Sequence, residues 1–484
     1  MPLFYHKSNF LSIIFRIDFH STPLCDIIQM ILKESSGAIV KNLLFSGKDL
    51  RRLILPLIIE QILAIGVGMI DTMMISQEGD AAISGVSLVD MVNHLIITIL
   101  AALATGGAVI VSQYIGHRDR DAANRAAGQL ITVTTLISSA IAFVCLVLCR
   151  PFLSLLFGAI EADVMESAVI YFRISAYSYP FLAVYNACAA LFRSMGNSKI
   201  SMYVSAGMNI TNAVGNALLI FVFDMGVAGA AWASFFSRAL AAAVMFRLLL
   251  SKKNHVYLQM RAIFAWEGQL IRKILFIACP SGIENGIFQL GRVLVVSIIA
   301  GFGTTQIAAN AVANNLDAMG CIAGQAMNLA MITVIGRCLG AGDTEQAEYF
   351  AKKMMKITYA ATAVVNIIIF SNLWWILGVY DLSDEARQLS LILICIHNGL
   401  AVFLWPASFT MPNILRAGGD VRFPMVISVT SMIVFRIVFS LILGVGCSLG
   451  AIGVWIAMVL DWIFRSTNFY IRFKKGKWKT IKVI

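Results

Sequence analysis

The sequence has few charged residues. Asp, Glu, Lys and Arg make up 13% of the 484 residues, whereas a soluble domain carries roughly 25%. Hydrophobic residues make up 59%, a content that excludes intrinsic disorder as well as an ordinary soluble globule. Only a chain that is solvated by lipid can carry so few charges, and we therefore expect a protein with many membrane spans.

The sequence also lacks the common motifs of catalysis and metal binding. It contains no Walker A loop, HExxH, GxSxG or kinase signature. Its nine cysteines include no CxxC pair and no Cys/His group with zinc-ligand spacing. We therefore expect neither an enzyme nor a resident cofactor or metal. Any energy for transport must come from an ion gradient or from a partner.

The chain has a net charge of +11, which in a soluble protein would suggest nucleic acid. Here the cations fall in alternate connections between apolar runs, so membrane orientation is the better explanation and no nucleic-acid partner is expected. The connections on the opposite side are poor in Lys and Arg. This asymmetry places both termini and the 251–269 connection in the cytoplasm, for a multi-pass protein of the plasma (inner) membrane. The cation-rich connections contain Arg118, Arg120, Arg125, Arg193, Lys199, Lys252, Lys253, Arg261, Arg272, Lys273, Arg337, Lys352, Lys353, Arg416 and Arg422, and the C-terminus adds Arg472, Lys474, Lys475, Lys477 and Lys479.

A spanning helix needs about 20 apolar residues, and the sequence supplies twelve such runs. The fold class is therefore an all-α membrane protein with twelve transmembrane helices. Pro180 and Pro406 lie inside long runs and predict kinks there. The expected spans are roughly 53–76, 84–115, 122–149, 163–192, 200–223, 226–250, 270–300, 304–336, 346–377, 385–414, 423–446 and 450–471.

The two halves of the sequence repeat each other. A shift of 224 residues aligns Pro56 with Pro280 and Gly79 with Gly303. Each half holds six spans, an even number, so both enter the membrane in the same orientation and form two six-helix bundles around a pseudo-two-fold axis. The expected domains are an N-terminal cytoplasmic segment 1–47, a six-helix bundle 48–250, a cytoplasmic linker 251–269, a second six-helix bundle 270–473 and a basic tail 474–484. Within the first segment, the run Phe10–Ile17 is too short to span, and Met30 is an alternative start.

Ionisable residues inside spans are costly and by default face a cavity. In the first span, Glu60 and Asp71 lie 11 residues apart, which places them within about 20° on one helix face and about 16 Å apart along it. In the fifth span, Asn212 and Asn216 lie one turn apart. These groups can hold a cation, but Glu60 is also placed to reach the headgroups, and amides also join helices structurally.

Equivalent spans of the two halves carry matching polar stripes. Asp90, Asn93 and His94 lie in the second span, and Asn314 and Asp317 occupy the positions equivalent to Asp90 and Asn93. Such stripes suit a shared aqueous cleft, in which His94 is a candidate proton carrier or a structural histidine. The seventh span adds polar residues to the same cleft, and Glu284 is the repeat equivalent of Glu60. These residues are Glu284, Asn285, Gln289 and Arg292.

Several segments of the sequence resemble those of a known protein family. The segment from Pro56 to Asp71-Thr72, the turn Gly116-His117-Arg118-Asp119 and the turn Arg193-Ser194-Met195-Gly196-Asn197 resemble multidrug and toxic compound extrusion (MATE) transporters. The Asn-rich fifth span and Gly226-Val-Ala-Gly229 fit the same resemblance, which covers about residues 48–475. It implies export of bulky, often cationic compounds in exchange for Na⁺ or H⁺ by alternating access.

The resemblance also implies a cation-coupling site. Asp71 matches the acid of the family's first span, and Asn212 matches its polar residue in the fifth. Asn216 stands where many relatives carry a second acid, so the coupling ion, a transient Na⁺ or a proton at Asp71, stays open. The candidate cleft residues for small organic cations are Glu60, Asp90, Asn93, Glu284, Gln289, Asn314 and Asp317. A monomer is expected.

One alternative function remains at this point. Arg292 and Arg436 would suit a flippase of related architecture that carries anionic lipid-linked saccharides, whereas the acids disfavour it. A channel has little support because no filter-like loop is present.

Overall fold

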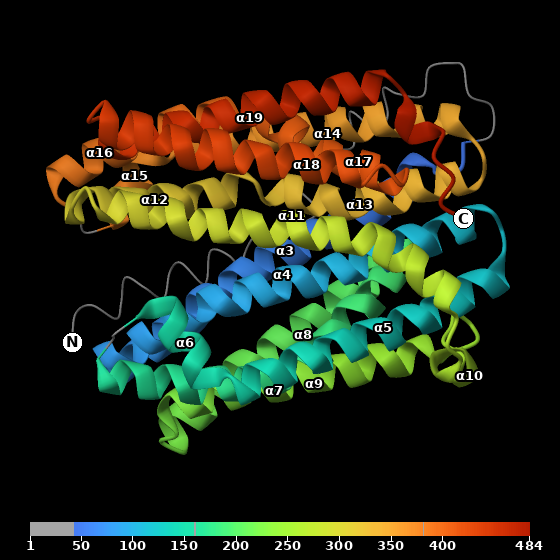
Figure 1. Cartoon of the computed structure of the whole chain (residues 1–484), viewed down its shortest axis with the longest axis horizontal. Helices are drawn as coiled ribbons and strands as arrows, with labels where there is room; N and C mark the ends of the chain where they lie inside the picture. Colours follow the sequence, from blue (N-terminus) through green and yellow to red (C-terminus); the bar gives the residue numbers. More distant parts are fainter. Residues whose placement is uncertain (1–42, 159–160, 381) are drawn as a thin grey trace.

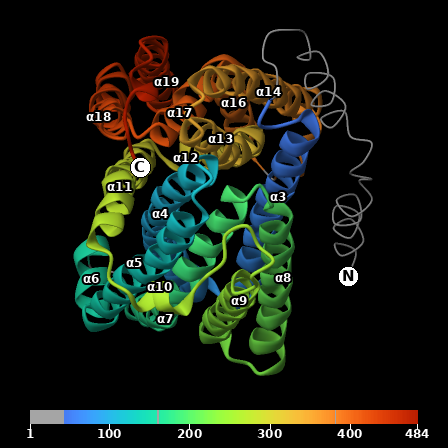
Figure 2. The same cartoon turned by 90° about the vertical axis from the view of Figure 1, so that its right-hand side faces the viewer.

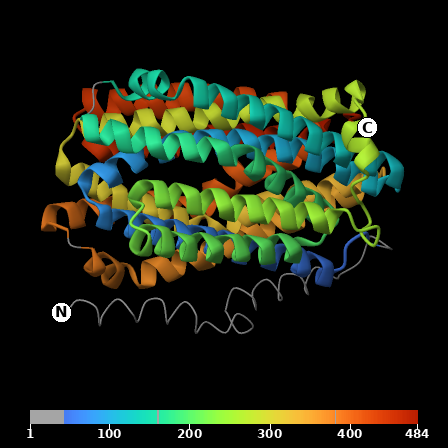
Figure 3. The same cartoon turned by 90° about the horizontal axis from the view of Figure 1, so that it is seen from below.

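The long helices run side by side along the longest axis of the molecule (Figures 1 and 3). The structure is a computed structural model and describes residues 43–158, 161–380 and 382–484. The expected features at Phe10–Ile17 and Met30, and all but the end of the expected segment 1–47, lie outside these ranges. Within them, every regular element is a helix.

The first half of the chain forms one bundle. Its elements are α3 (Gly47–Ile75), η1 (Ser76–Glu78), α4 (Asp80–Gly116), α5 (Arg120–Val147), α6 (Cys149–Phe157), α7 (Ala162–Ser194), α8 (Ser198–Asn216), η2 (Ala217–Val222) and α9 (Gly226–Leu249). A short helix, α10 (Met260–Phe264), follows in the connection to the second half.

The second half forms the other bundle, which lies above the first in Figure 1. Its elements are α11 (Gly268–Ala300), α12 (Thr304–Gly320), α13 (Ile322–Gly340), α14 (Thr344–Ser371), α15 (Leu373–Val379), α16 (Asp384–Trp405), η3 (Pro406–Thr410), α17 (Met411–Ala417), α18 (Arg422–Ser431), η4 (Met432–Val438), η5 (Leu441–Gly446), α19 (Gly450–Lys474) and η6 (Lys477–Lys479).

The expected twelve-helix, two-bundle architecture is confirmed. Among the described residues, 11 helices are long and apolar enough to cross a membrane. The expected fourth span is α7, which has 33 residues and continues through Pro180 without a break. The expected eighth span is not one continuous helix, because the chain breaks at Cys321 between α12 and α13. At Pro406 the helix widens into the π-helical turn η3, as expected for a proline that cannot donate a backbone hydrogen bond.

The repeat is visible in the backbone itself. Gly79 and Gly303, which precede α4 and α12, have φ/ψ values of 98°/171° and 99°/170°. Such positive φ values favour glycine, which explains why it occupies both positions. The carboxylates of Asp119 and Asp343 cap α5 and α14 by accepting from the backbone N–H three residues later, at 2.9 and 2.8 Å. The two halves therefore share turns and caps at equivalent positions.

A close glycine contact joins the last two helices of each half. A Cβ added at Gly229 would lie 2.9 Å from the backbone of Leu219, and one at Gly453 would lie 2.6 Å from that of Leu443. Leu219 and Leu443 lie in π-helical turns at equivalent places, η2 and η5. Each hairpin is thus held backbone against backbone, which only glycine permits.

Helix α3 packs against both bundles. Its later residues reach α8, while its first turns share a core cluster with α13, α14 and α17 of the other bundle (Figure 2). Leu50, Leu53 and Leu57 are at most 1% exposed in that cluster. The expected domain boundary between residues 47 and 48 therefore lies at the start of a helix that contacts both bundles.

Candidate functional site

The N-terminal bundle contains a polar cluster in the interior of its spans. Asn216 on α8 donates to Asp71 on α3, with 2.7 Å between Nδ2 and Oδ1. Asn212, one turn earlier on α8, donates to the hydroxyl of Ser234 on α9 at 3.1 Å. The i, i+4 spacing of the two asparagines places both amides on the same side of α8. The structure thus brings Asp71 and Asn216 together, while Asn212 links α8 to α9.

The second carboxylate of this cluster is Asp90 on α4. Asn93 donates to Asp90 at 3.4 Å, and its own side-chain oxygen accepts from Tyr179 at 2.7 Å. Tyr171 also hydrogen-bonds Asp90, which lies within electrostatic range of Asp71. Two acids from neighbouring helices therefore share one polar region, which we call the acid cluster (Asp71, Asp90, Asn93, Asn212, Asn216 and their hydrogen-bond partners).

A cation that the sequence analysis did not select belongs to the same cluster. Arg238 on α9 donates to the hydroxyl of Ser178 at 2.8 Å and acts electrostatically on both Asp71 and Asp90. The signal for it was present, because Arg238 lies in the middle of an expected span, where an ionisable residue is a functional candidate by default. Tyr171 and Tyr179 carried no comparable signal, because aromatic residues are common in spans.

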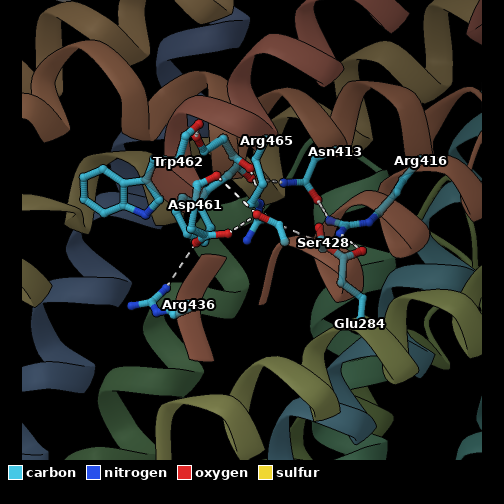
Figure 4. Close-up of polar contacts among 11 residues, drawn as sticks. Glu284, Asn413, Arg416, Ser428, Arg436, Asp461, Trp462 and Arg465 are labelled. Carbon is cyan, nitrogen blue, oxygen red and sulfur yellow. Dashed lines mark hydrogen bonds and ion pairs between the residues drawn. The ribbon is translucent and has the colours of Figure 1, made fainter. Parts of the chain in front are cut away.

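Glu60 and Glu284 are buried, and each has an arginine partner. Glu284 is 5% exposed and accepts from Arg416 at 2.5 Å and from Ser428 at 2.7 Å (Figure 4). Glu60 is 8% exposed, with Arg193 at 3.7 Å. Both acids are buried partners of an arginine of their own bundle, at equivalent places of the repeat. This pairing opposes the charge of each acid, and their role as cleft residues stays a prediction.

A second buried ion pair lies in the same C-terminal bundle (Figure 4). Arg436 is 3.6 Å from Asp461, which also accepts from Ser431. Arg465 donates to the carbonyl of Ser408 at 3.2 Å, and its guanidinium stacks 4.4 Å from the ring centre of Phe409. Buried charges of this kind are tolerated only when they are paired.

The acid of α12 has a different partner. Asp317 is 3.0 Å from Nδ1 of His397 on α16, and the imidazole packs between Trp455 and Trp462. Asn314 donates to the carbonyl of Asn310 in its own helix at 2.9 Å. Asn314 and Asp317 thus lie about one turn apart on α12, each with a partner of its own. Gln289 is partly buried on α11, and His94 is exposed on α4.

The two bundles meet at the end where the cation-rich connections lie, which we call the basic end (Figure 2 is viewed from it). Arg337 donates to the carbonyl of Ser194 at 2.8 Å, and Gln113 donates to the carbonyl of Ala417 at 2.8 Å. A Cβ added at Gly340 would lie 2.0 Å from the carbonyl oxygen of Gln113. The bundles are therefore in backbone contact at the basic end.

The structure offers no preformed metal centre in the part that it describes. Across residues 43–158, 161–380 and 382–484, no group of three or more His, Cys, Asp or Glu side chains is placed to hold a metal ion. A cation at the acid cluster would rest on two carboxylates with amide and hydroxyl oxygens. Such oxygens are suitable partners for a hard cation or a proton.

Comparisons with known proteins agree with this architecture. The MatE family model matches residues 56–218 and again residues 280–442, so the repeat is confirmed with its offset. A Bacillus subtilis (strain 168) protein named "Uncharacterized transporter YisQ" is 28% identical over 436 residues, which cover 87% of this chain and 93% of that protein. A Thermotoga maritima protein named "Probable multidrug resistance protein NorM" is 26% identical over 444 residues, which cover 90% of this chain and 94% of that protein.

Solved structures show the same fold. An outward-facing multidrug resistance MATE family transporter superposes with a TM-score of 0.81 at 20% identity, covering 90% of this chain and 97% of that chain. A Vibrio cholerae MATE transporter superposes with a TM-score of 0.82 at 18% identity, covering 90% of this chain and 98% of that chain.

Two repeated six-helix bundles with charged clusters inside their spans define a multi-pass membrane transporter. The chain belongs to the MatE family, the multidrug and toxic compound extrusion (MATE) transporters, because the family model matches both halves.

Proposed function

We propose that this MATE transporter is a secondary active antiporter that exports organic cations in exchange for Na⁺ or H⁺. The observation that carries the proposal is the acid cluster, in which Asp71 and Asp90 lie within the spans. Asn216 donates a hydrogen bond to the Asp71 carboxylate, with 2.7 Å between Nδ2 and Oδ1. A carboxylate in a medium of low dielectric attracts a proton, a metal cation or an organic cation strongly, so these ligands compete for it.

The arrangement of the bundles supports alternating access as the transport mode. Hydrogen bonds and glycine contacts close the basic end, and the cation-rich connections favour a cytoplasmic location for that end. With that orientation, we propose that the structure corresponds to an outward-facing state. Binding of the coupling ion at Asp71 would change the relative stability of the two states by its difference in affinity for them. The proposal includes a location in the plasma (inner) membrane, cytoplasmic termini and function as a monomer.

The flippase alternative receives no support from the site. Arg436, one of the two arginines that suggested it, is buried against Asp461 at 3.6 Å, so its charge is already paired. We therefore propose only the antiporter.

The proposal is tested with proteoliposomes loaded with a fluorescent cationic dye. We expect an imposed Na⁺ or H⁺ gradient to drive the dye out, and we expect Asp71→Asn to abolish this movement, because an amide cannot take up the coupling ion. The matched control is Asp80→Asn, which removes an exposed carboxylate from the first turn of α4. Gradient-driven export that survives in Asp71→Asn, or dye movement under neither gradient, would contradict the proposal.

A further inference from the structure

Among the described residues, Arg238 is an arginine that acts on both carboxylates of the acid cluster. Arg238 on α9 is partly buried, and its Nη1 donates to the hydroxyl of Ser178 on α7 at 2.8 Å. One turn before it on α9, Ser234 accepts from Asn212. Arg238 is therefore held by a neutral partner on a neighbouring helix, within a cluster to which α3, α4, α7, α8 and α9 all contribute.

Arg238 differs in this respect from three other arginines inside the bundles. Arg193, Arg416 and Arg436 each have a carboxylate within 4 Å, at 3.7, 2.5 and 3.6 Å respectively. Arg238 bonds directly to a hydroxyl and acts on Asp71 and Asp90 through space. Its charge therefore opposes both carboxylates without occupying the oxygen atoms of either one.

We propose that Arg238 is a specificity-determining residue that holds the acid cluster at one net negative charge, so that the cluster accepts one monovalent cation and discriminates against dications. This inference rests on the proposed export of cations and names the charge class of the cargo. Two carboxylates and one guanidinium leave a single negative charge to be matched by a proton, Na⁺ or a monocation.

Electrostatics gives the reason for the discrimination. In a partly desolvated site, an excess positive charge is costly because it loses its hydration and gains no counter-charge. A dication at the cluster would leave one such excess charge, whereas a monocation would leave none. The repulsion by Arg238 is also twice as large for a dication, since Coulomb energy scales with the charge.

The test compares two cations of nearly equal shape, N-methyl-4-phenylpyridinium with one charge and N,N′-dimethyl-4,4′-bipyridinium with two. Their dissociation constants are measured by calorimetry on the purified full-length protein in detergent, at fixed pH and ionic strength. For Arg238→Gln we expect about tenfold tighter binding of the monocation, and the square of that factor, about a hundredfold, for the dication. Arg238→Lys retains the charge and is expected to bind both as the wild type does.

A charge cycle separates charge from structure. Asp90→Asn removes the last net negative charge and should weaken both cations, whereas Asp90→Asn combined with Arg238→Gln restores one net charge and should restore the wild-type ratio of the two affinities. The matched control is Arg247→Gln, which removes an exposed arginine from the last turn of the same helix and should change neither constant.

The outcomes distinguish the two proposals. Equal gains for both cations in Arg238→Gln, no gain for either, or the same change in Arg238→Lys would overturn the role of Arg238. Wild-type protein that binds neither cation would instead contradict the proposed export of cations.

Discussion

The contact between α4 and α13 at the basic end makes one glycine decisive for the conformation of the transporter. A Cβ at Gly340 would lie 2.0 Å from the carbonyl oxygen of Gln113 and 2.6 Å from its Cα. Both are backbone atoms, so no change of rotamer can relieve the overlap. Gly340→Ala must therefore separate the two helices by about 1 Å to reach ordinary van der Waals contact.

The size of the effect follows from the bonds beside this contact. Three hydrogen bonds lie beside it. Two of them, from Arg337 to Ser194 and from Gln113 to Ala417, are 2.8 Å long. The third, from Thr333 to the carbonyl of Arg193, is 3.2 Å long. A separation of about 1 Å takes all three beyond hydrogen-bonding distance. One charged and two neutral hydrogen bonds contribute about 4 kcal/mol together. Their loss would shift the ratio of states closed and open at the basic end by about a thousandfold.

The assay is the distance between spin labels on the two bundles at the basic end. Arg125 on α5 and Lys352 on α14 have side chains 49% and 60% exposed and accept labels as cysteines, after the exposed Cys279, Cys395 and Cys447 are changed to serine. We expect Gly340→Ala to move the distance distribution towards longer values. The control is Gly207→Ala on α8, where no atom lies within 4 Å of the added Cβ. Identical distributions for the two variants would refute the reasoning.

Two further predictions concern stability, measured as the thermal unfolding midpoint in detergent. Glu284→Gln leaves Arg416 and Arg465 buried without their shared carboxylate, and we expect a loss of about 3–5 kcal/mol. Glu348→Gln, which disrupts a partly exposed pair with Lys352, should cost at most about 1 kcal/mol, and equal losses would contradict the argument. Trp478→Ala removes a side chain that is 0% exposed and should cost about 3–5 kcal/mol. Trp374→Ala, at a position that is 73% exposed, should have little effect, and a larger loss there than at Trp478 would refute the packing argument.

The sequence predicted the features that depend on local pattern. The repeat was visible because turns such as those at Gly79 and Gly303 need a positive φ, which restricts the residue to glycine in both halves. The side-by-side asparagines Asn212 and Asn216 follow from helical period alone. To predict the contact between Asp71 and Asn216, the family resemblance was needed as well. The helical period alone does not show which helices are neighbours.

The features that depend on lateral packing were not predictable in this way. Glu60 and Arg193 are 133 positions apart in the sequence. From the sequence, Glu60 was expected to line a cleft and Arg193 to lie in a cation-rich connection. Their ion pair at 3.7 Å exists because α3 packs against α8, the helix that begins just after Arg193. The position of Arg238 inside an expected span made it a candidate, but its action on Asp71 and Asp90, which lie on other helices, could not be predicted from the sequence.

The matching hairpins at Gly229 and Gly453 bear on the ancestry of the molecule. A chain whose halves share orientation, turns and backbone contacts has the geometry of a symmetric dimer of six-helix subunits that has become a single polypeptide. In a symmetric dimer every substitution appears twice, so the two halves cannot diverge. In this chain the glycine contacts are duplicated, whereas Asp90 of one half corresponds to Asn314 at the equivalent position of the other. The scaffold has kept its symmetry, and the chemistry inside it has become asymmetric.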